Sequence, residues 1–181
     1  KEFQKLMMET QITLENLWQK FADLEPADKK LLICDRGTMD IKAYIEPKAF
    51  MEILGEMQLK IADVRDIRYD AVFHLVTAAN GAEEFYNRDN PSRHEKTLDE
   101  AVKTDTRILS AWNGHEHLRI IGNTEISADG VKTVSFEEKK EKLLKEVCRA
   151  LHIPVPLEIE RAYLIDSSTD PETFPVPIDI A

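Results

Sequence analysis

The stretch Leu31-Leu32-Ile33-Cys34-Asp35-Arg36-Gly37 joins an apolar run to an acid, a base and a glycine. A short continuous apolar run is typical of a strand that is buried on both faces of a parallel sheet. Ligands bind at the carboxyl ends of such strands, where Asp35 and Arg36 would lie. Aspartate can hold Mg²⁺ through water, and arginine can bind a phosphate or a carboxylate with two hydrogen bonds. The stretch therefore predicts a charged ligand site, with a helix-capping aspartate beside a surface arginine as the alternative.

The rest of the chain alternates predicted helices and strands, which favours an α/β fold with parallel strands. Hydrophobic residues at helical spacing, continuous apolar runs and capping sequences define the segments. Helices are predicted over about 1–22, 43–55, 97–112 and 136–152, and strands over 31–34, 71–77 and 118–121.

A glycine-rich phosphate loop is missing from this sequence. None of the six glycines is followed by lysine, so the motif G-x-x-x-x-G-K-[ST] does not occur. About three strands are also fewer than a sheet of this kind usually holds. We therefore expect an incomplete domain, in a natural protein that continues upstream of Lys1.

Composition narrows the class of partner. The 181 residues carry a formal net charge of −10, which repels the phosphate backbone, so we expect no nucleic-acid partner. The two cysteines do not form a disulfide framework, which favours a reducing, cytoplasmic location. No apolar stretch approaches the roughly 20 residues of a transmembrane segment.

Two sets of motifs resemble known families. The pattern Asp35-Arg36-Gly37…Ala43-Tyr44 is similar to the Asp-Arg-Tyr…Ala-Tyr segment of thymidylate and deoxynucleoside kinases. RYDAVFHLVTAANGAEEFY (68–86), AWxGH (111–115) and FEEK (136–139) resemble the kinase-like P-loop ATPase domain of the TRPL translocation defect protein family.

The second resemblance implies two regions. Residues 1–153 would be a P-loop NTPase domain of the nucleoside-monophosphate-kinase-like class without its P-loop strand. Residues 154–181 would be a linker and the first strand of a triphosphate-tunnel (CYTH-like) β-barrel. Glu158-Ile159-Glu160-Arg161 resembles the Glu-x-Glu-x-Lys opening of such barrels, although Ala162 stands where the lysine is expected.

The resemblance also implies roles for individual residues. Asp35 would be the acid near Mg²⁺, and Arg36 would face the substrate or a phosphate. Arg88 and Arg93 fall in the segment that resembles the kinase lid, with a solvated loop as the alternative. The remaining assignments are phosphate binding by Arg107, the nucleotide base near Asn123 and Thr124, and the substrate side for Asp40 and Tyr44.

The function that the resemblance implies is binding of GTP or ATP with Mg²⁺, in a protein that would regulate membrane-protein trafficking. Phosphoinositides or trafficking proteins would be its further partners, and it could associate peripherally with membranes. The alternatives are a non-catalytic scaffold with a degenerate nucleotide site and a true nucleoside or nucleotide kinase. Two histidine features carry no such role: His74 reads as a hydrogen-bonded core residue, and His115-Glu116-His117 as a polar loop before a strand.

Overall fold

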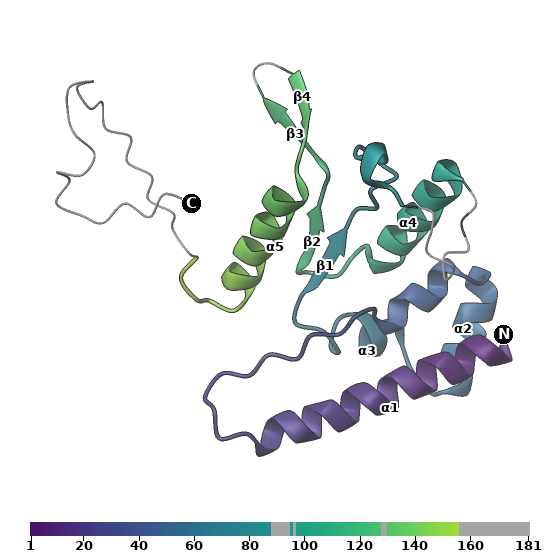
Figure 1. Cartoon of the computed structure of the whole chain (residues 1–181). Helices are drawn as coiled ribbons and strands as arrows, with labels where there is room; N and C mark the ends of the chain where they lie inside the picture. Colours follow the sequence, from purple (N-terminus) through teal and green to yellow (C-terminus); the bar gives the residue numbers. More distant parts are fainter. Residues whose placement is uncertain (88–94, 96, 128–129, 156–181) are drawn as a thin grey trace, which may run out of the picture.

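The computed structural model describes residues 1–87, 95, 97–127 and 130–155, and Figure 1 shows the order of their helices and strands. The first half contains α1 (Glu2–Leu24), the 3₁₀-helix η1 (Thr38–Ala43), α2 (Pro47–Glu56) and α3 (Ile61–Arg65). The second half contains β1 (Val72–Leu75), the 3₁₀-helix η2 (Glu83–Phe85), α4 (Leu98–Trp112), β2 (Leu118–Ile121), β3 (Thr124–Ser127), β4 (Gly130–Thr133) and α5 (Phe136–Ala150).

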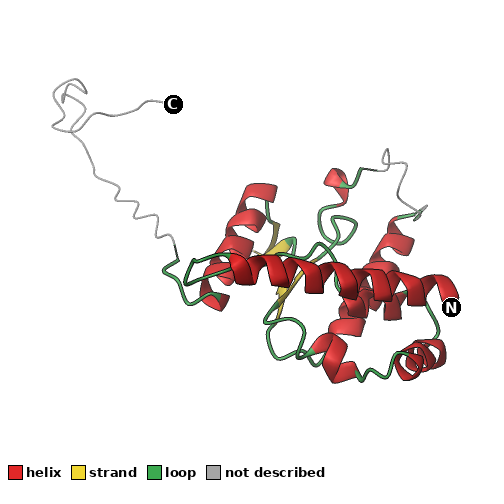
Figure 2. Ribbon diagram, turned by 90° about the horizontal axis from the view of Figure 1, so that it is seen from below, coloured by secondary structure: helices red, strands yellow, loops and turns green. Residues whose placement is uncertain are grey.

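A small parallel sheet places the chain in the α/β class, as the sequence predicts. β1 and β2 pair in parallel, with Val72 beside Leu118 and Leu75 beside Ile121. Helix α5 packs against β2, and Figure 2 shows the two strands behind α1. The sheet thus presents one carboxyl-terminal edge, at Leu75 and Ile121.

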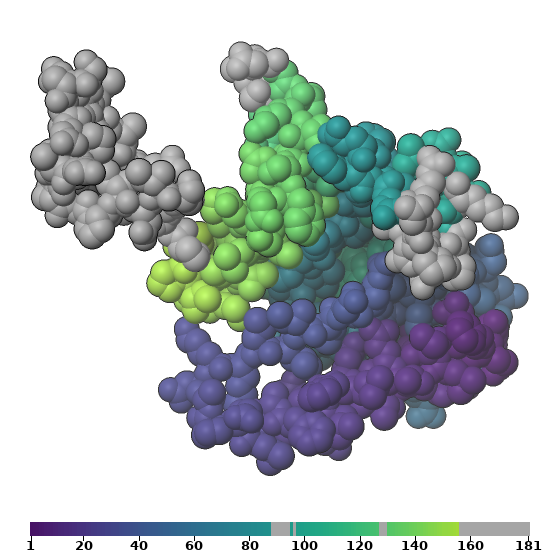
Figure 3. Space-filling model, viewed as in Figure 1, coloured from purple at the N-terminus to yellow at the C-terminus, as the bar shows by residue number. Residues whose placement is uncertain are grey.

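An antiparallel hairpin, which is not among the predicted elements, follows β2 directly. β3 pairs with β4, and the hairpin projects from the body of the molecule in Figure 3. The side chains that the structure describes in this hairpin are exposed, Ile126 to 90%. Each of the two strands carries a single large apolar residue, Ile126 and Val131, so the hairpin lacks the apolar alternation from which half-buried strands are recognised.

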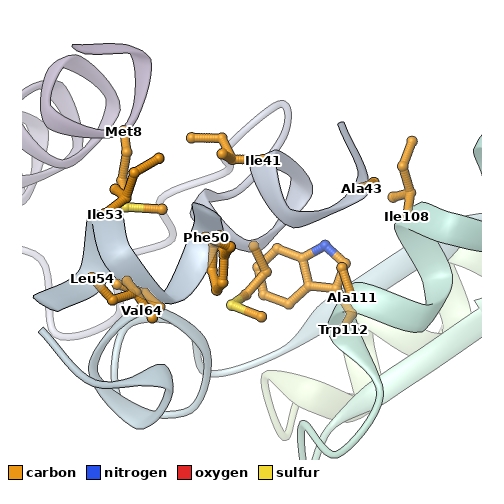
Figure 4. Packing of buried hydrophobic residues seen from close by; sticks show 11 residues of the cluster. Met8, Ile41, Ala43, Phe50, Ile53, Leu54, Val64, Ile108, Ala111 and Trp112 are labelled. Carbon is orange, nitrogen blue, oxygen red and sulfur yellow. The ribbon is translucent and has the colours of Figure 1, made fainter. Parts of the chain in front are cut away.

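The hydrophobic core is built around η1 rather than around the sheet. Met39 of η1 is fully buried among side chains of the four neighbouring helices, which Figure 4 shows pointing toward one another. These side chains are Met8 of α1, Phe50, Ile53 and Leu54 of α2, Val64 of α3, and Ile108, Ala111 and Trp112 of α4. Burial of each large apolar side chain contributes roughly 1.5–3 kcal/mol, so this cluster fixes the position of η1.

The predicted strand over 31–34 is wrong for the described chain. Leu31 is 55% exposed and Ile33 80% exposed, and the segment runs as an extended trace above α1 in Figure 1. An extended segment becomes a strand only when a neighbour supplies backbone partners. Among the described residues, β1 pairs with β2 and none pairs with 31–34.

Other predicted elements are confirmed or revised. The strand over 118–121 and the helices that follow Thr97 and Ser135 are confirmed. The helix predicted over 43–55 is instead η1 followed by α2, which begins with Pro47 at its first turn. Proline favours that position because the first helical N–H groups have no intrahelical acceptor.

Several predictions fall outside the described residues. These are the lid arginines Arg88 and Arg93 and the barrel-like strand that contains Glu158-Ile159-Glu160-Arg161. Within the described ranges, no helix is long and apolar enough to cross a bilayer.

Candidate functional site

Asp105 of α4 binds the end of strand β1. Its Oδ1 accepts a hydrogen bond from the backbone N–H of Thr77 at 3.1 Å, and its Oδ2 lies 3.2 Å from Nε2 of His74. His74 is only 7% exposed, which confirms the prediction of a hydrogen-bonded core histidine. One carboxylate therefore joins α4 to the carboxyl-terminal edge of the sheet.

Asn123 follows β2 at the same edge and is 5% exposed. Its Nδ2 donates to Thr77 O at 2.7 Å and to Asn80 O at 2.8 Å, and lies 3.4 Å from Val76 O. Because an amide group has two N–H donors, these carbonyls occupy both of them. The side chain thus binds the loop that follows β1, which we call the β1 loop (residues 76–81).

Thr124 also packs against the β1 loop, at Gly81. A Cβ added to Gly81 would lie 2.8 Å from Thr124 Cγ2, and Gly81 has a φ of +84°. Only glycine adopts this backbone conformation without strain, and only glycine leaves room for the threonine methyl group. Asn123 and Thr124 therefore both contact the β1 loop, at the edge where parallel sheets bind ligands.

Lys139 of α5 completes this edge, although no motif of the sequence predicts a role for it. Its Nζ donates to Val76 O at 2.6 Å and to Asn123 Oδ1 at 2.6 Å. Burial lowers the pKa of Lys139, while the nearby Asp105 carboxylate acts in the opposite direction. The only sequence signal is the FEEK segment, which places the lysine one turn after the Ser135 cap but does not show what it contacts.

Arg36 stands at the start of η1 in an unusual backbone conformation. Its φ is 79°, in the left-handed region that non-glycine residues rarely occupy, and its carbonyl accepts a hydrogen bond from Gln11 Nε2 at 3.1 Å. Its side chain is 63% exposed, and Nη1 lies 3.4 Å from Asp40 Oδ2. The neighbouring Asp35 is exposed. Backbone strain of this kind costs on the order of 1–3 kcal/mol and is concentrated at functional sites.

Asp40 lies between Arg36 and the core. It is 9% exposed, and its Oδ1 accepts a 2.6 Å hydrogen bond from the indole Nε1 of Trp112. A buried indole N–H needs an acceptor, and this bond ties η1 to the end of α4. Asp40 thus contacts an exposed arginine with one oxygen and a core tryptophan with the other.

Tyr44 and Arg107 line the same cavity, although 62 positions separate them in the sequence. This cavity is wide open to solvent, has a volume of about 690 Å³ and is also lined by Glu95, Glu100, Val102, Lys103, Thr104 and Thr106. Arg107 Nη2 donates to Thr104 Oγ1 at 3.2 Å. The structure therefore separates the proposed site residues into the Asp35–Asp40 segment, this cavity, and the carboxyl-terminal edge of the sheet.

A resident metal site would require several converging ligands. Within the part of the chain that the structure describes, no group of three or more His, Cys, Asp or Glu side chains could hold an ion. His115 bonds to Tyr69 O through Nε2 at 2.8 Å, so its ring is held in the core. Asp35 is a single carboxylate, which suits Mg²⁺ that arrives already bound to phosphates.

Comparison with protein-family models matches residues 1–128 to the AAA domain. The chain belongs to the AAA domain family. The match covers the core around η1, the parallel sheet, α4 and the Asp35-Arg36 stretch, and it identifies a P-loop NTPase-like, nucleotide-binding type of domain. It ends before α5, so Lys139 lies outside the matched part of this AAA domain. Searches of curated proteins and of solved structures found no match.

Proposed function

We propose that this AAA domain binds a nucleoside triphosphate, GTP or ATP with Mg²⁺, at the carboxyl-terminal edge of β1 and β2. The observation that carries the proposal is the ordered edge itself, where Asp105, Asn123 and Lys139 bind the β1 loop. Open parallel sheets bind their ligands at this edge, and the family match favours a nucleotide.

The phosphate groups need a loop that these 181 residues do not contain. We propose that a further strand, which carries this loop, adds beside β1 and residues 31–33. The exposed apolar side chains of Leu31 and Ile33 support this, as does the pairing of β1 with β2 alone among the described strands. Without the loop and its lysine, phosphoryl transfer by the chain alone would be negligible.

In this proposal the charged residues act on the phosphates. Asp35 would bind Mg²⁺ through water, and Arg36 would bind a phosphate or the acceptor. Arg88, Arg93 and Arg107 would close over the phosphate groups, while Asn123 and Thr124 would shape the region near the base. Mg²⁺ itself would neutralise phosphate charge.

The physiological role we propose is regulatory, in a protein like those of the TRPL translocation defect family, with trafficking proteins or phosphoinositides as further partners. The resemblance of the 68–86 block supports this role. A non-catalytic scaffold would use the same nucleotide site without turnover.

A second candidate function is phosphoryl transfer to a small acceptor. The cavity that Tyr44, Thr104 and Arg107 line favours it, because a kinase needs a separate pocket for its acceptor. Asp40 and Tyr44 would then lie on the substrate side. Loss of turnover in Arg36→Ala would support this candidate, and unchanged turnover would count against it.

Titration calorimetry of the natural full-length protein with Mg-GTP and Mg-ATP tests nucleotide binding. Arg36→Ala should weaken the affinity roughly tenfold to a hundredfold, since it removes a charge-assisted hydrogen bond to phosphate. Arg149→Ala is the matched control, because the two arginine side chains are 63% and 64% exposed. No heat with either nucleotide, in a folded sample, would contradict the proposal.

A further inference from the structure

The backbone of the β1 loop is held by side chains from three separate segments of the chain: α4, the link between β2 and β3, and α5. Val76 N donates to Ile121 O at 3.0 Å, as in a strand, but Val76 O accepts from Lys139. Thr77 N is bound by Asp105 of α4, and Thr77 O by Asn123. The backbone N–H and C=O groups of a surface loop are usually exposed to water. In the β1 loop, by contrast, side chains bind them.

Lys139 occupies the key position in this arrangement. It is the donor for both the carbonyl of Val76 and the side-chain oxygen of Asn123, and Asn123 in turn binds Thr77 and Asn80. Asn123 is oriented by this bond, because its Oδ1 must face the ammonium for its Nδ2 to face the loop. Removing the Lys139 ammonium would therefore abolish its hydrogen bond to Val76 and weaken the hold of Asn123 on the β1 loop.

We propose that Lys139 is a positioning residue that holds the β1 loop in the conformation that receives the nucleotide. The inference rests on the proposed function and names a residue outside the family match. Its physical basis is preorganisation: a loop that is ordered before binding costs less conformational entropy when the ligand arrives. Lys139 acts through Val76 and Asn123, without contact with the nucleotide.

The test compares Lys139→Met with Lys140→Met in the natural full-length protein. Methionine keeps most of the apolar stem and removes the ammonium. Lys140 is the adjacent lysine on α5, and its side chain is 60% exposed. Hydrogen exchange of peptides that cover residues 76–82 is measured without nucleotide, and affinity for Mg-GTP and Mg-ATP is measured by calorimetry.

Lys139→Met should speed exchange in the β1 loop and leave peptides from η1 unchanged. Nucleotide affinity should fall on the order of tenfold, because the loosened loop must be ordered when the nucleotide binds. Lys140→Met should change neither, and Lys139→Arg should recover both in part. If Lys139→Met does not fold, Lys139→Gln replaces it and should give a smaller change in the same direction.

Two results would overturn the inference. The first is an unchanged exchange rate of the β1 loop in a folded Lys139→Met protein. The second is faster exchange with unchanged nucleotide affinity, which would leave Lys139 a purely structural role. Absence of nucleotide binding by the wild-type protein would instead refute the proposed function, and the exchange measurement would still show whether Lys139 orders the loop.

Discussion

Gly37 is the last residue of the stretch 31–37. Glycine is required there because another side chain lies too close for a Cβ, and not because of the backbone conformation. An added Cβ would lie 2.5 Å from Cζ2 of Trp112, which is 4% exposed and held by Asp40. Gly37→Ala should lower the free energy of unfolding by roughly 1–3 kcal/mol, because the indole cannot move away. Urea denaturation measures this change.

The matched control is Gly55→Ala, in α2, where no atom beyond the adjacent residues and the helix's own backbone lies within 4 Å of the added Cβ. Alanine is a better helix former than glycine by up to about 1 kcal/mol, so this variant should be as stable as wild type or more stable. If both variants lost stability equally, the contact with Trp112 would not explain the requirement for glycine.

The residues of the candidate site differ in how far sequence could predict them. Asn123 is found by position, because it follows an apolar strand and ligands bind where parallel strands end. Lys139 could not be found in this way, since its role depends on α5 folding back against β2. Asp40 was predicted for the substrate side, and its bond to Trp112 joins positions that sequence spacing does not relate.

At the scale of elements, α5 begins with a capping box that also sets the position of Lys139. Ser135 Oγ accepts from Glu138 N at 3.2 Å, and Glu138 accepts from Ser135 N at 2.7 Å. The hydrogen bond from Ser135 N, together with the side chains of Ser135 and Lys132, lowers the pKa of the Glu138 carboxyl group to about 2. Ser135→Ala should cost about 0.5–2 kcal/mol of stability and speed amide exchange in the first turn of α5.

Ser110→Ala, at an exposed position inside α4, is the control for this prediction and should change stability by about 0.5 kcal/mol or less. An equal loss in both variants would refute the capping explanation. Ser135→Ala should also increase exchange in the β1 loop slightly, because the first turn of α5 carries Lys139.

The elements that sequence predicts correctly are those with local signals. The helices α4 and α5 have capping sequences and apolar faces, and β2 is a short apolar run closed by glycine. Residues 31–34 have the same local composition, yet they form no strand because pairing depends on a neighbour elsewhere in the chain. The 3₁₀-helix η1 was missed because its burial comes from four other helices, not from a periodicity of its own.

At the scale of the whole molecule, Tyr69 joins α1, η1 and the segment that leads into β1. Its hydroxyl accepts from Thr38 N at 2.9 Å and donates to Glu15 Oε1 at 2.9 Å. Tyr69→Phe leaves the buried Thr38 N–H without this acceptor, which should cost about 1–3 kcal/mol near neutral pH. The effect should reach peptides of both α1 and η1 in hydrogen exchange, because the hydroxyl contacts both elements.

The same residue predicts how stability responds to alkaline pH. Burial raises the pKa of Tyr69 to about 12 from the ordinary tyrosine value of 10.0, so between these values the unfolded chain ionises the phenol and the folded protein does not. Wild-type stability therefore falls as pH rises through this window. The phenylalanine variant lacks this loss, so the free-energy difference between the two proteins should narrow from pH 10 to pH 12. The net charge of −10 becomes more negative in both proteins alike, so self-repulsion cancels in the comparison.

Tyr44→Phe, at a residue that is 51% exposed, should change stability near neutral pH by about 0.5 kcal/mol or less. The free-energy difference between wild type and Tyr69→Phe could instead stay constant from pH 10 to pH 12. That result would show that the Tyr69 phenol is not kept un-ionised by its contacts with α1 and η1.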